Sequence, residues 1–437
     1  MKHIYISILV NLLGGFGLLN ATNPPPTIED VDFYEAGSNY YNYPWLTETP
    51  PEQTPVPDGY IPYHIEHYGR HGSRWHLGNT NYDIPYKLLK KAHKDGKLTE
   101  LGDEVYHIVD DIRNEFKGRD GELSDKGALQ HFVIGQRMAR NFPEVINSIA
   151  DIDARSTVVI RCILSMQNGL KGIQTVVPDL KVTTDASQAD MWYMNYEDAV
   201  ANNIRKNANE KYLKPFTAKH KNKGDYLSRL FSDPVYANKY IGEQLEAPLF
   251  ALLVNTQSHL KQPWILDRVF SKEEILENWL TKNATFFLMS GNSKLTSGMM
   301  PYKQINLLTN IIESADTALV TPHPSANLRY GHDTVLLPLV CLMEINNFGE
   351  EINNLEDLAP RGWHDYLITP MGANLQIIFY RPDKDDFNTD DVIVKVMLNE
   401  EEVTLPISRD SGPYYSWKDF RDYYMKKMEN HKGDNKS

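Results

Sequence analysis

The stretch of the sequence that most clearly could do chemistry is Arg70-His71-Gly72-Ser73-Arg74, in which two arginines bracket a histidine. Guanidinium groups bind phosphate oxygens two at a time, so such a patch of fixed positive charge favours a phosphate ligand. The run from Tyr60 to Tyr68 reads as a strand, bounded by Asp58-Gly59 before it and Gly69 after it. The sequence therefore predicts a phosphate-binding loop that follows a strand and presents an imidazole.

Two further stretches place charged side chains where a strand is expected to give way to a helix. A short strand is expected to end near Arg155, and a helix follows it through about Gly172. The chain from 326 to 334 has the same layout, ahead of an apolar helix at 335–345. Taken alone, Arg161 reads as an exposed residue of a first helical turn and Asp333 as a capping carboxylate. Beside the first motif, both become candidates for the same site.

Together these motifs resemble those of the histidine acid phosphatases, within the histidine phosphatase superfamily. They are RHGxR at 70–74, RST-xxx-R at 155–161 and His-Asp at 332–333, and G-x-L-S-x-x-G at 121–127 extends the resemblance. The resemblance implies that His71 is a nucleophile that forms a phosphohistidine and that Asp333 is the general acid. It also implies a phosphate pocket formed by Arg70, Arg74, Arg161 and His332. Arg155 is then a further charge near this pocket.

The implied chemistry needs no metal or cofactor, because the arginines supply the positive charge that Mg²⁺ provides in other phosphoryl-transfer sites. Gly72 is expected to let the loop backbone approach the phosphate without a side chain in the way. A carboxylic acid donates a proton only while it is protonated, so we expect faster turnover at mildly acidic pH.

Some details resemble one branch of this family, the multiple inositol polyphosphate phosphatases. They are the run at 336–339 and the strand that begins at Asn374. Those enzymes usually carry His-Ala-Glu at the second motif, whereas this sequence has His332-Asp333-Thr334, so positional specificity stays open. We expect a polyphosphorylated small-molecule ester such as phytate as substrate. A broad-specificity or sugar-phosphate phosphatase is the enzymatic alternative, and a non-catalytic phosphoester-binding protein is a third reading.

Composition limits the classes of partner. The 437 residues are 41% hydrophobic and 11% aromatic, which is ample for a packed core, and the net charge of −13 argues against nucleic acid or an anionic membrane surface as a partner. The only cysteines are Cys162 and Cys341, which excludes a disulfide framework or a cysteine zinc site. A single bridge between them or two buried thiols both fit the sequence.

The first 21 residues have the layout of a secretory signal peptide, with a basic start, an apolar run from Ile4 to Leu19 and a cleavage point after Ala21. An uncleaved anchor is the alternative. The apolar run is shorter than the roughly 20 residues that a spanning helix needs. We therefore expect a periplasmic or secreted protein with no membrane span after cleavage.

The fold implied by the family is α/β, a mixed-sheet sandwich core with an inserted α-helical cap. We assign 22–185 to the first part of the core, with an extended N-terminal arm at 22–57 laid over the surface. Residues 186–300 form the cap, and 301–437 form the second part of the core. The early cap is strongly basic, so it forms either a solvated face or a rim over the site that favours several phosphates, including Lys206, Lys211 and Lys214.

Periodicity predicts the remaining elements. Helices are expected at 85–93, 98–116, from about 122 onward, and at 417–428, and a capping box is expected at Ser271. Further strands are expected at 176–184, 374–380 and 392–397, the last turning at 399–401 into a hairpin with 403–405. In the helix after 122, the side chains expected to face a core are Leu129, Phe132, Val133, Gly135 and Met138.

Three histidines near the first motif suggest a metal site together with Glu66, but His67 and Glu66 face opposite sides of an alternating strand. We interpret these histidines as structural; they are His64, His67 and His76. Trp75 is expected to be a pocket wall or core residue.

Overall fold

The computed structural model describes residues 30–221, 224–384, 386–409 and 411–434. At its centre lies a mixed β-sheet with the strand order β3-β2-β4-β1-β5-β6-β7, in which β8 also pairs with β6. The first four strands of that order are parallel, and the others are antiparallel. The strands are β1 Tyr60–Arg70, β2 Asp151–Ser156, β3 Val182–Asp185, β4 Ser325–Gly331, β5 Asn374–Pro382, β6 Ile393–Leu398, β7 Glu401–Glu402 and β8 Tyr414–Ser416.

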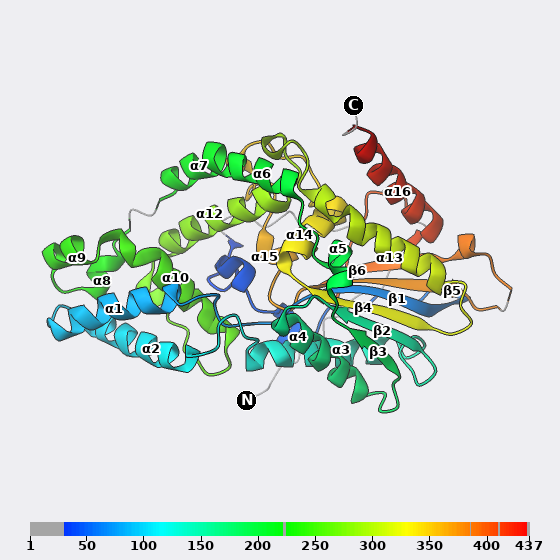
Figure 1. The fold of residues 1–437 in the computed structure, drawn as a ribbon, viewed down its shortest axis with the longest axis horizontal. Helices are drawn as coiled ribbons and strands as arrows, with labels where there is room; N and C mark the ends of the chain where they lie inside the picture. Colours follow the sequence, from blue (N-terminus) through cyan, green and yellow to red (C-terminus); the bar gives the residue numbers. More distant parts are fainter. Residues whose placement is uncertain (1–29, 222–223, 385, 410, 435–437) are drawn as a thin grey trace, which may run out of the picture.

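Helices cover both faces of the sheet, as Figure 1 shows, and this confirms the expected α/β sandwich. Successive residues of β5 point to opposite faces: Ile377 packs into one hydrophobic cluster and Ile378 into another. On the first face lie α13 (Ile305–Ala318), α14 (Asp333–Leu342) and α16 (Trp417–Asp434). On the second lie α3 (Asp125–Asn141) and α4 (Ile160–Gln174). A strand buried on both faces explains the continuous apolar run at 377–379.

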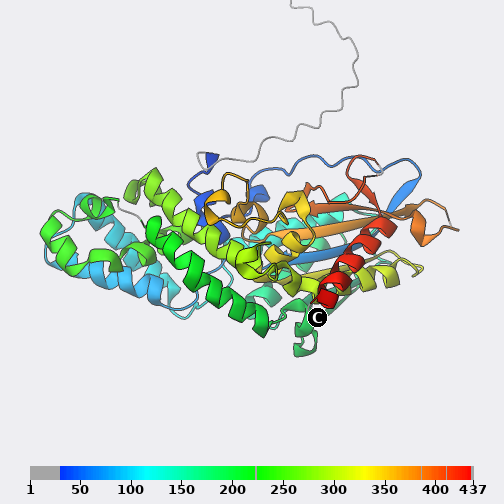
Figure 2. The ribbon, with the colours of Figure 1, turned by 90° about the horizontal axis from the view of Figure 1, so that it is seen from above.

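A helical lobe lies beside the sheet, on the left of Figures 1 and 2. Its hydrophobic cluster joins helices from two separate parts of the chain. The division into domains stays a prediction, but α1 and α2, which we placed in the core segment 22–185, pack with helices of the segment 186–300. The helices of the lobe are α1 Thr80–Lys94, α2 Glu100–Phe116, α8 Tyr226–Leu230, α9 Pro234–Tyr240, α10 Glu246–Val254, α11 Leu266–Val269 and the start of α12 Lys272–Ser290.

Three further helices link the lobe to the sheet, namely α5 (Met191–Met194), α6 (Ala199–Ala208) and α7 (Lys214–Lys219). Several helix starts are fixed by side-chain caps, which satisfy backbone N–H groups that have no partner within the helix. Thr99 Oγ1 accepts from Gly102 N ahead of α2 at 3.0 Å. Ser271 forms the predicted capping box with Glu274 ahead of α12.

Three details of the predicted elements were wrong. The strand expected at 176–184 is confined to Val182–Asp185, because β3 is a short edge strand that pairs with β2 alone. In α3, Leu129 is 40% exposed, and the buried side of the helix carries Gln130 and His131 instead. The polar residues turn inward because this end of α3 adjoins the phosphate loop. A turn is confirmed at Asn399 and Glu400, both at positive φ, but the strand that returns from it is β7 at Glu401–Glu402 and not the expected 403–405.

The N-terminal arm is described from residue 30 onward, and it does not simply lie over the surface as expected. Residues 36–39 are buried between the lobe and the core. Tyr41 O accepts from Met371 N at 2.7 Å, and Tyr43 donates its hydroxyl to Glu400 Oε2 at 2.7 Å. Aromatic side chains that looked like surface cover are thus anchors that hold the arm inside the molecule.

Within the described ranges, no helix is both long and apolar enough to cross a membrane. The segment 1–21, predicted as a signal peptide, lies outside the described residues.

Candidate active site

The predicted motifs meet at the carboxyl ends of three parallel strands. Arg70, the last residue of β1, pairs in register with Gly331, the last residue of β4. Ser156, the last residue of β2, pairs with Tyr330 on the other side of β4. Ligands of open α/β sheets bind at this edge, where the chain leaves each strand. The loop after β1 and the starts of α4 and α14 are therefore placed side by side.

Hydrogen bonds fix the loop after β1 at both of its ends. His71 N donates to Gly331 O at 2.9 Å, and Gly372 N donates to His71 O at 3.1 Å. Ser73 N donates to Gln130 Oε1 of α3 at 2.8 Å. The loop is thus a rigid platform and not a free surface loop.

The two glycine motifs of the sequence pack directly on one another. A Cβ atom on Gly72 would lie 2.4 Å from Gly127 O, and one on Gly127 would lie 2.2 Å from Ser73 O. Side chains cannot approach that closely, so only glycine fits at either position. The glycine at 72 therefore allows close contact with α3, and its expected role in the approach to phosphate stays a prediction. Ser124 completes the junction by capping α3 and donating to Ser73 O at 3.0 Å.

Three guanidinium groups face the same space. Arg70 Nη1 donates to Thr369 O at 2.7 Å, and Arg74 Nη1 donates to Trp75 O at 2.9 Å, which leaves other donors free. The Nε atoms of Arg70, Arg74 and Arg161 are buried and have no hydrogen-bond partner among the described residues. Buried donors are normally satisfied, so three unused ones mark a place built for an anion.

His71 is a neutral imidazole with a free nitrogen. Burial, together with the charges of Arg70, Arg74 and Arg161, lowers the pKa of His71 well below its ordinary value. His71 Nδ1 lies 2.9 Å from Gly72 O, and a carbonyl can only accept, so Nδ1 carries the proton. The lone pair of Nε2 is then available for attack.

Asp333 is held by two side chains from distant parts of the chain, Arg70 of the first motif and Asn39 of the N-terminal arm. Its Oδ2 lies 2.9 Å from Arg70 Nη2, and Asn39 Nδ2 donates to the same oxygen at 3.0 Å. Thr334 N donates to Oδ1 at 2.8 Å. Burial alone would raise the pKa of Asp333, but Arg70 and its other partners outweigh burial and lower the pKa below the usual range. The carboxyl is therefore ionised while the pocket holds no anion.

His332 lies beside His71, with ring centroids 5.8 Å apart. Its Nε2 is 3.2 Å from Thr157 Oγ1, and the buried thiol of Cys162 lies 3.8 Å from the same nitrogen. Burial and the charge of Arg161 lower the pKa of His332 to about 4. Cys162 and Cys341 are both free and buried, which agrees with two thiols, one of the two alternatives that the sequence left open.

The structure does not bring the remaining predicted charges into this group. Arg155 is engaged by carboxylates at the sheet edge: its Nε lies 2.9 Å from Asp153 Oδ2 and its Nη1 2.9 Å from Asp190 Oδ2. Arg155 and Ser156 are successive residues of β2, so their side chains point to opposite faces of the sheet. The cap lysines are exposed, and a role for them at the rim stays a prediction; they are Lys206, Lys211 and Lys214.

The neighbouring histidines are structural, as expected. His64 Nε2 lies 2.9 Å from Glu66 Oε1, and the same carboxylate pairs with Arg329, so Glu66 balances a buried charge. His76 Nδ1 contacts Tyr40 Oη at 2.9 Å, and its Nε2 contacts Ala251 O at 3.0 Å. Trp75 is buried in the hydrophobic cluster of the lobe.

Sequence reasoning missed the contribution of the arm. Asn39 contacts Asp333, and the ring of Tyr40 lies 5.5 Å from the guanidinium carbon of Arg74. Ser38, which precedes them, has φ 58° and ψ −128°, a conformation that costs a side-chain-bearing residue about 1–3 kcal/mol. Its hydroxyl is held by the buried carboxylate of Asp365. The sequence offered no signal beyond an aromatic, proline-rich composition.

Comparison with known proteins agrees with this geometry. The chain matches the sequence profile of the histidine phosphatase superfamily (branch 2) over residues 69–399. The chain belongs to this superfamily. Membership identifies it as a phosphatase, and the matched region begins one residue before the RHGxR motif and includes every element of the pocket except Asn39 and Tyr40.

Solved structures with the same fold include a multiple inositol polyphosphate phosphatase and a phytase. The Bifidobacterium longum multiple inositol polyphosphate phosphatase in complex with phosphate is 17% identical, with a TM-score of 0.67 over 89% of this chain and 97% of that one. The phytase from D. castellii is 18% identical, with a TM-score of 0.66 over 95% and 90% of the two chains. No curated protein matches the chain. At 17–18% sequence identity, the similarity to these structures shows a shared fold and nothing beyond it.

Proposed function

We propose that this protein is a secreted, metal-independent histidine acid phosphatase whose substrates are inositol polyphosphates such as phytate. The observation that carries the proposal is the convergence of one neutral imidazole, three arginines with unused donors and one carboxyl group at a single edge of the sheet. The substrate class is supported by two solved complexes of the B. longum phosphatase of the same fold, one with phosphate and one with inositol hexasulfate.

In the proposed reaction, His71 Nε2 attacks phosphorus in line with the leaving oxygen. The N–P bond forms as the P–O bond to the alcohol breaks, and Asp333 gives its proton to the departing oxygen. Arg70, Arg74 and Arg161 stabilise the charge on the equatorial oxygens of the transition state. Water then attacks the phosphohistidine: the new O–P bond forms as the N–P bond breaks, and the ionised Asp333 takes up the proton that water loses. Inorganic phosphate leaves, and both the imidazole and the acid are restored.

The lowered pKa of Asp333 is compatible with a role as an acid. A bound phosphate group gives Arg70 a new counter-ion and places negative charge beside Asp333, and both changes raise the pKa of its carboxyl group. Asp333 therefore takes up a proton as the ester binds. At mildly acidic pH that proton is available, which supports the expected acid optimum.

A cavity of about 440 Å³ next to Tyr40 supports the alternative reading of a broader or sugar-phosphate phosphatase. Its lining carries Lys221 and Lys282, but also three glutamates, so it is not a purely cationic surface for a polyphosphate. The glutamates are Glu243, Glu246 and Glu277.

Rates of phosphate release from phytate, glucose-1-phosphate and an aryl phosphate test the two readings. A kcat/KM for phytate at least tenfold above the others supports the inositol polyphosphate reading, and equal values support the broad one. His71→Ala should abolish turnover of all three esters while phosphate still binds. Turnover that survives in His71→Ala would refute the phosphohistidine mechanism.

Export is tested separately. Cell fractionation and the mass of the mature protein should place it outside the cytoplasm with its chain beginning at Thr22. A cytoplasmic protein that retains residues 1–21 would refute this part of the proposal and leave the chemistry unaffected.

A further inference from the structure

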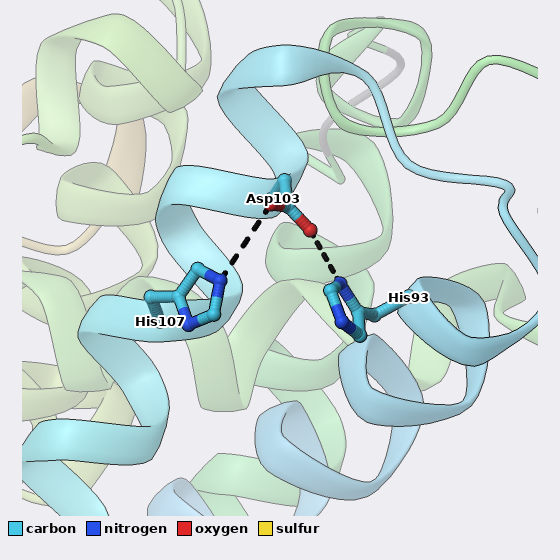
Figure 3. A group of neighbouring side chains, drawn as sticks. All are labelled: His93, Asp103 and His107. Atoms are coloured by element: carbon cyan, nitrogen blue, oxygen red, sulfur yellow. Dashed lines mark hydrogen bonds and ion pairs between the residues drawn. The ribbon is translucent and has the colours of Figure 1, made fainter.

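A cluster of two histidines and one aspartate joins α1 and α2 in the helical lobe, away from the phosphate pocket. His93 lies in the last turn of α1, and Asp103 and His107 lie one turn apart on α2 (Figure 3). His93 Nδ1 is 2.5 Å from Asp103 Oδ1, and His107 Nε2 is 3.6 Å from Asp103 Oδ2. One atom from each residue lies within 4.8 Å of those of the other two.

The donor set suits a borderline transition-metal ion. Two imidazole nitrogens and a carboxylate are ligands that Zn²⁺ takes at about 2.0–2.2 Å, and donors around a tetrahedral ion then lie roughly 3.4 Å apart. The three donors are therefore at most about 1.4 Å farther apart than a tetrahedral ion requires. The side chains are 40–62% exposed, so rotation about their side-chain bonds can close this gap without moving the helices. Two neutral imidazoles and one carboxylate also leave the site one negative charge.

The backbone beneath the cluster is firmly held. Tyr106, between the two ligands of α2, packs its ring on His93 with centroids 4.6 Å apart. Arg113 of α2 forms an ion pair with Asp83 of α1 at 2.7 Å, which fixes the far ends of the two helices. Three ligands are thus presented by two helices whose mutual position is already set, so binding does not have to order them.

Nearby cations already have other partners. Lys91 lies 2.5 Å from Asp95, Lys97 lies 2.7 Å from Asp233, and Arg268 forms a bidentate pair with Glu104. Asp103 is therefore not neutralised by these groups, and its contacts are with the two imidazoles. An imidazole must lose its proton to bind a metal, so a metal ion and protons compete for this cluster.

We propose that His93, Asp103 and His107 form a binding site for a transition-metal ion with the coordination preferences of Zn²⁺, which cross-links α1 and α2. Water fills the remaining coordination positions, because the cluster is open to solvent. The site is separate from the proposed phosphatase chemistry, which requires no metal. Its effect is on the stability of the helical lobe.

Metal binding is measured on the whole chain after treatment with a chelator. Zn²⁺ titration by calorimetry should show one site per chain, and Co²⁺ should give visible ligand-field absorption that Zn²⁺ displaces. His107→Ala and Asp103→Asn should each weaken Zn²⁺ binding at least about tenfold, since even loss of an outer-sphere partner costs roughly 10- to 100-fold. Asp103→Asn is diagnostic because asparagine keeps a hydrogen bond to imidazole but lacks the charge.

His323→Ala, which removes an exposed histidine elsewhere, is the matched control and should bind Zn²⁺ like the original protein. Saturating Zn²⁺ should raise the Tm by a few degrees in the original protein and the control but not in His107→Ala. Zn²⁺ binding should weaken as the pH falls, because protons compete with the metal for the imidazole nitrogens. Equal Zn²⁺ affinity in the original protein, His107→Ala and Asp103→Asn would overturn the proposal and leave an ordinary hydrogen-bonded surface cluster.

Discussion

Replacing Asn39 by alanine should move the alkaline limb of the pH–rate profile toward higher pH. Asn39 Nδ2 donates to Asp333 Oδ2 at 3.0 Å, and this hydrogen bond favours the ionised carboxylate. Its loss therefore raises the pKa of Asp333, so the proposed general acid stays protonated up to a higher pH. The amide thus tunes the acid as well as positioning it.

The size of the shift follows from the structure. A hydrogen bond to a charged group contributes about 1.5–3 kcal/mol, and one pKa unit corresponds to about 1.4 kcal/mol. Arg70 Nη2, 2.9 Å from the same oxygen, remains in the variant and keeps most of the stabilisation of the carboxylate. We therefore expect the pKa of Asp333 to rise by about one unit, the lower end of the range that 1.5–3 kcal/mol allows. Looser positioning of the carboxyl group should also lower the maximal kcat several-fold.

The assay is kcat against pH on an aryl phosphate, because kcat reports ionisations of the enzyme–substrate complex. Asn39→Asp, which puts a like charge beside Asp333, should shift the limb further in the same direction. Asn42→Ala is the matched control, since Asn42 lies on the same arm but contacts Gln130 instead of Asp333. An unchanged limb in Asn39→Ala, or one moved to lower pH, would refute this account of Asp333. A lower kcat alone would indicate a purely structural role for the amide.

Three further changes test other parts of the structure. The pKa of buried Asp365 is raised to about 6, so its contribution to stability is greatest below the unfolded pKa of about 4 and is lost as pH rises through about 6. Asp365→Asn should remove this loss. Between about pH 4 and pH 8, the free energy of unfolding of the variant should therefore rise by up to about 3 kcal/mol relative to that of the original protein, as measured by urea unfolding at the two pH values. Arg161→Ala should lower kcat/KM about 100- to 1,000-fold, whereas Arg155→Ala, which removes a group paired with other carboxylates, should change it less than tenfold. Gly127→Ala should reduce activity more than about 100-fold in a protein whose circular dichroism is unchanged, because its Cβ would lie 2.2 Å from Ser73 O and displace the phosphate loop.

The candidate active site was accessible from sequence because its members lie in short motifs at strand-to-helix junctions. Arg70 ends a recognisable strand, His71 and Asp333 each follow one, and parallel strands bring such ends together. Asn39 and Tyr40 could not be found in this way, because they come from an irregular arm with no periodic pattern. Arg155 was expected as a further charge near the pocket, because a motif does not show that the carboxylates of Asp153 and Asp190 pair with its guanidinium group.

The basis of the two glycine motifs also required coordinates. Gly72 and Gly127 lie 55 positions apart, and only their contact explains why neither tolerates a side chain. Likewise, α1 and α2 read as ordinary amphipathic helices, whose apolar stripes do not reveal that α1 packs on the distant helix α10 and α2 on the distant helix α8.

The strand order has a consequence for how the protein becomes active during synthesis. Strand β4 lies between β1 and β2, although it follows them by more than 150 residues. A chain whose translation has reached α12 carries His71 and Arg161 but lacks the strand that joins their sheet segments and brings in Asp333. The ribosome must therefore release three quarters of the polypeptide before the hydrolytic centre can exist. Until then the edges of β1 and β2 that pair with β4 remain unpaired. Unpaired strand edges favour aggregation, so we expect chaperones to bind the nascent chain.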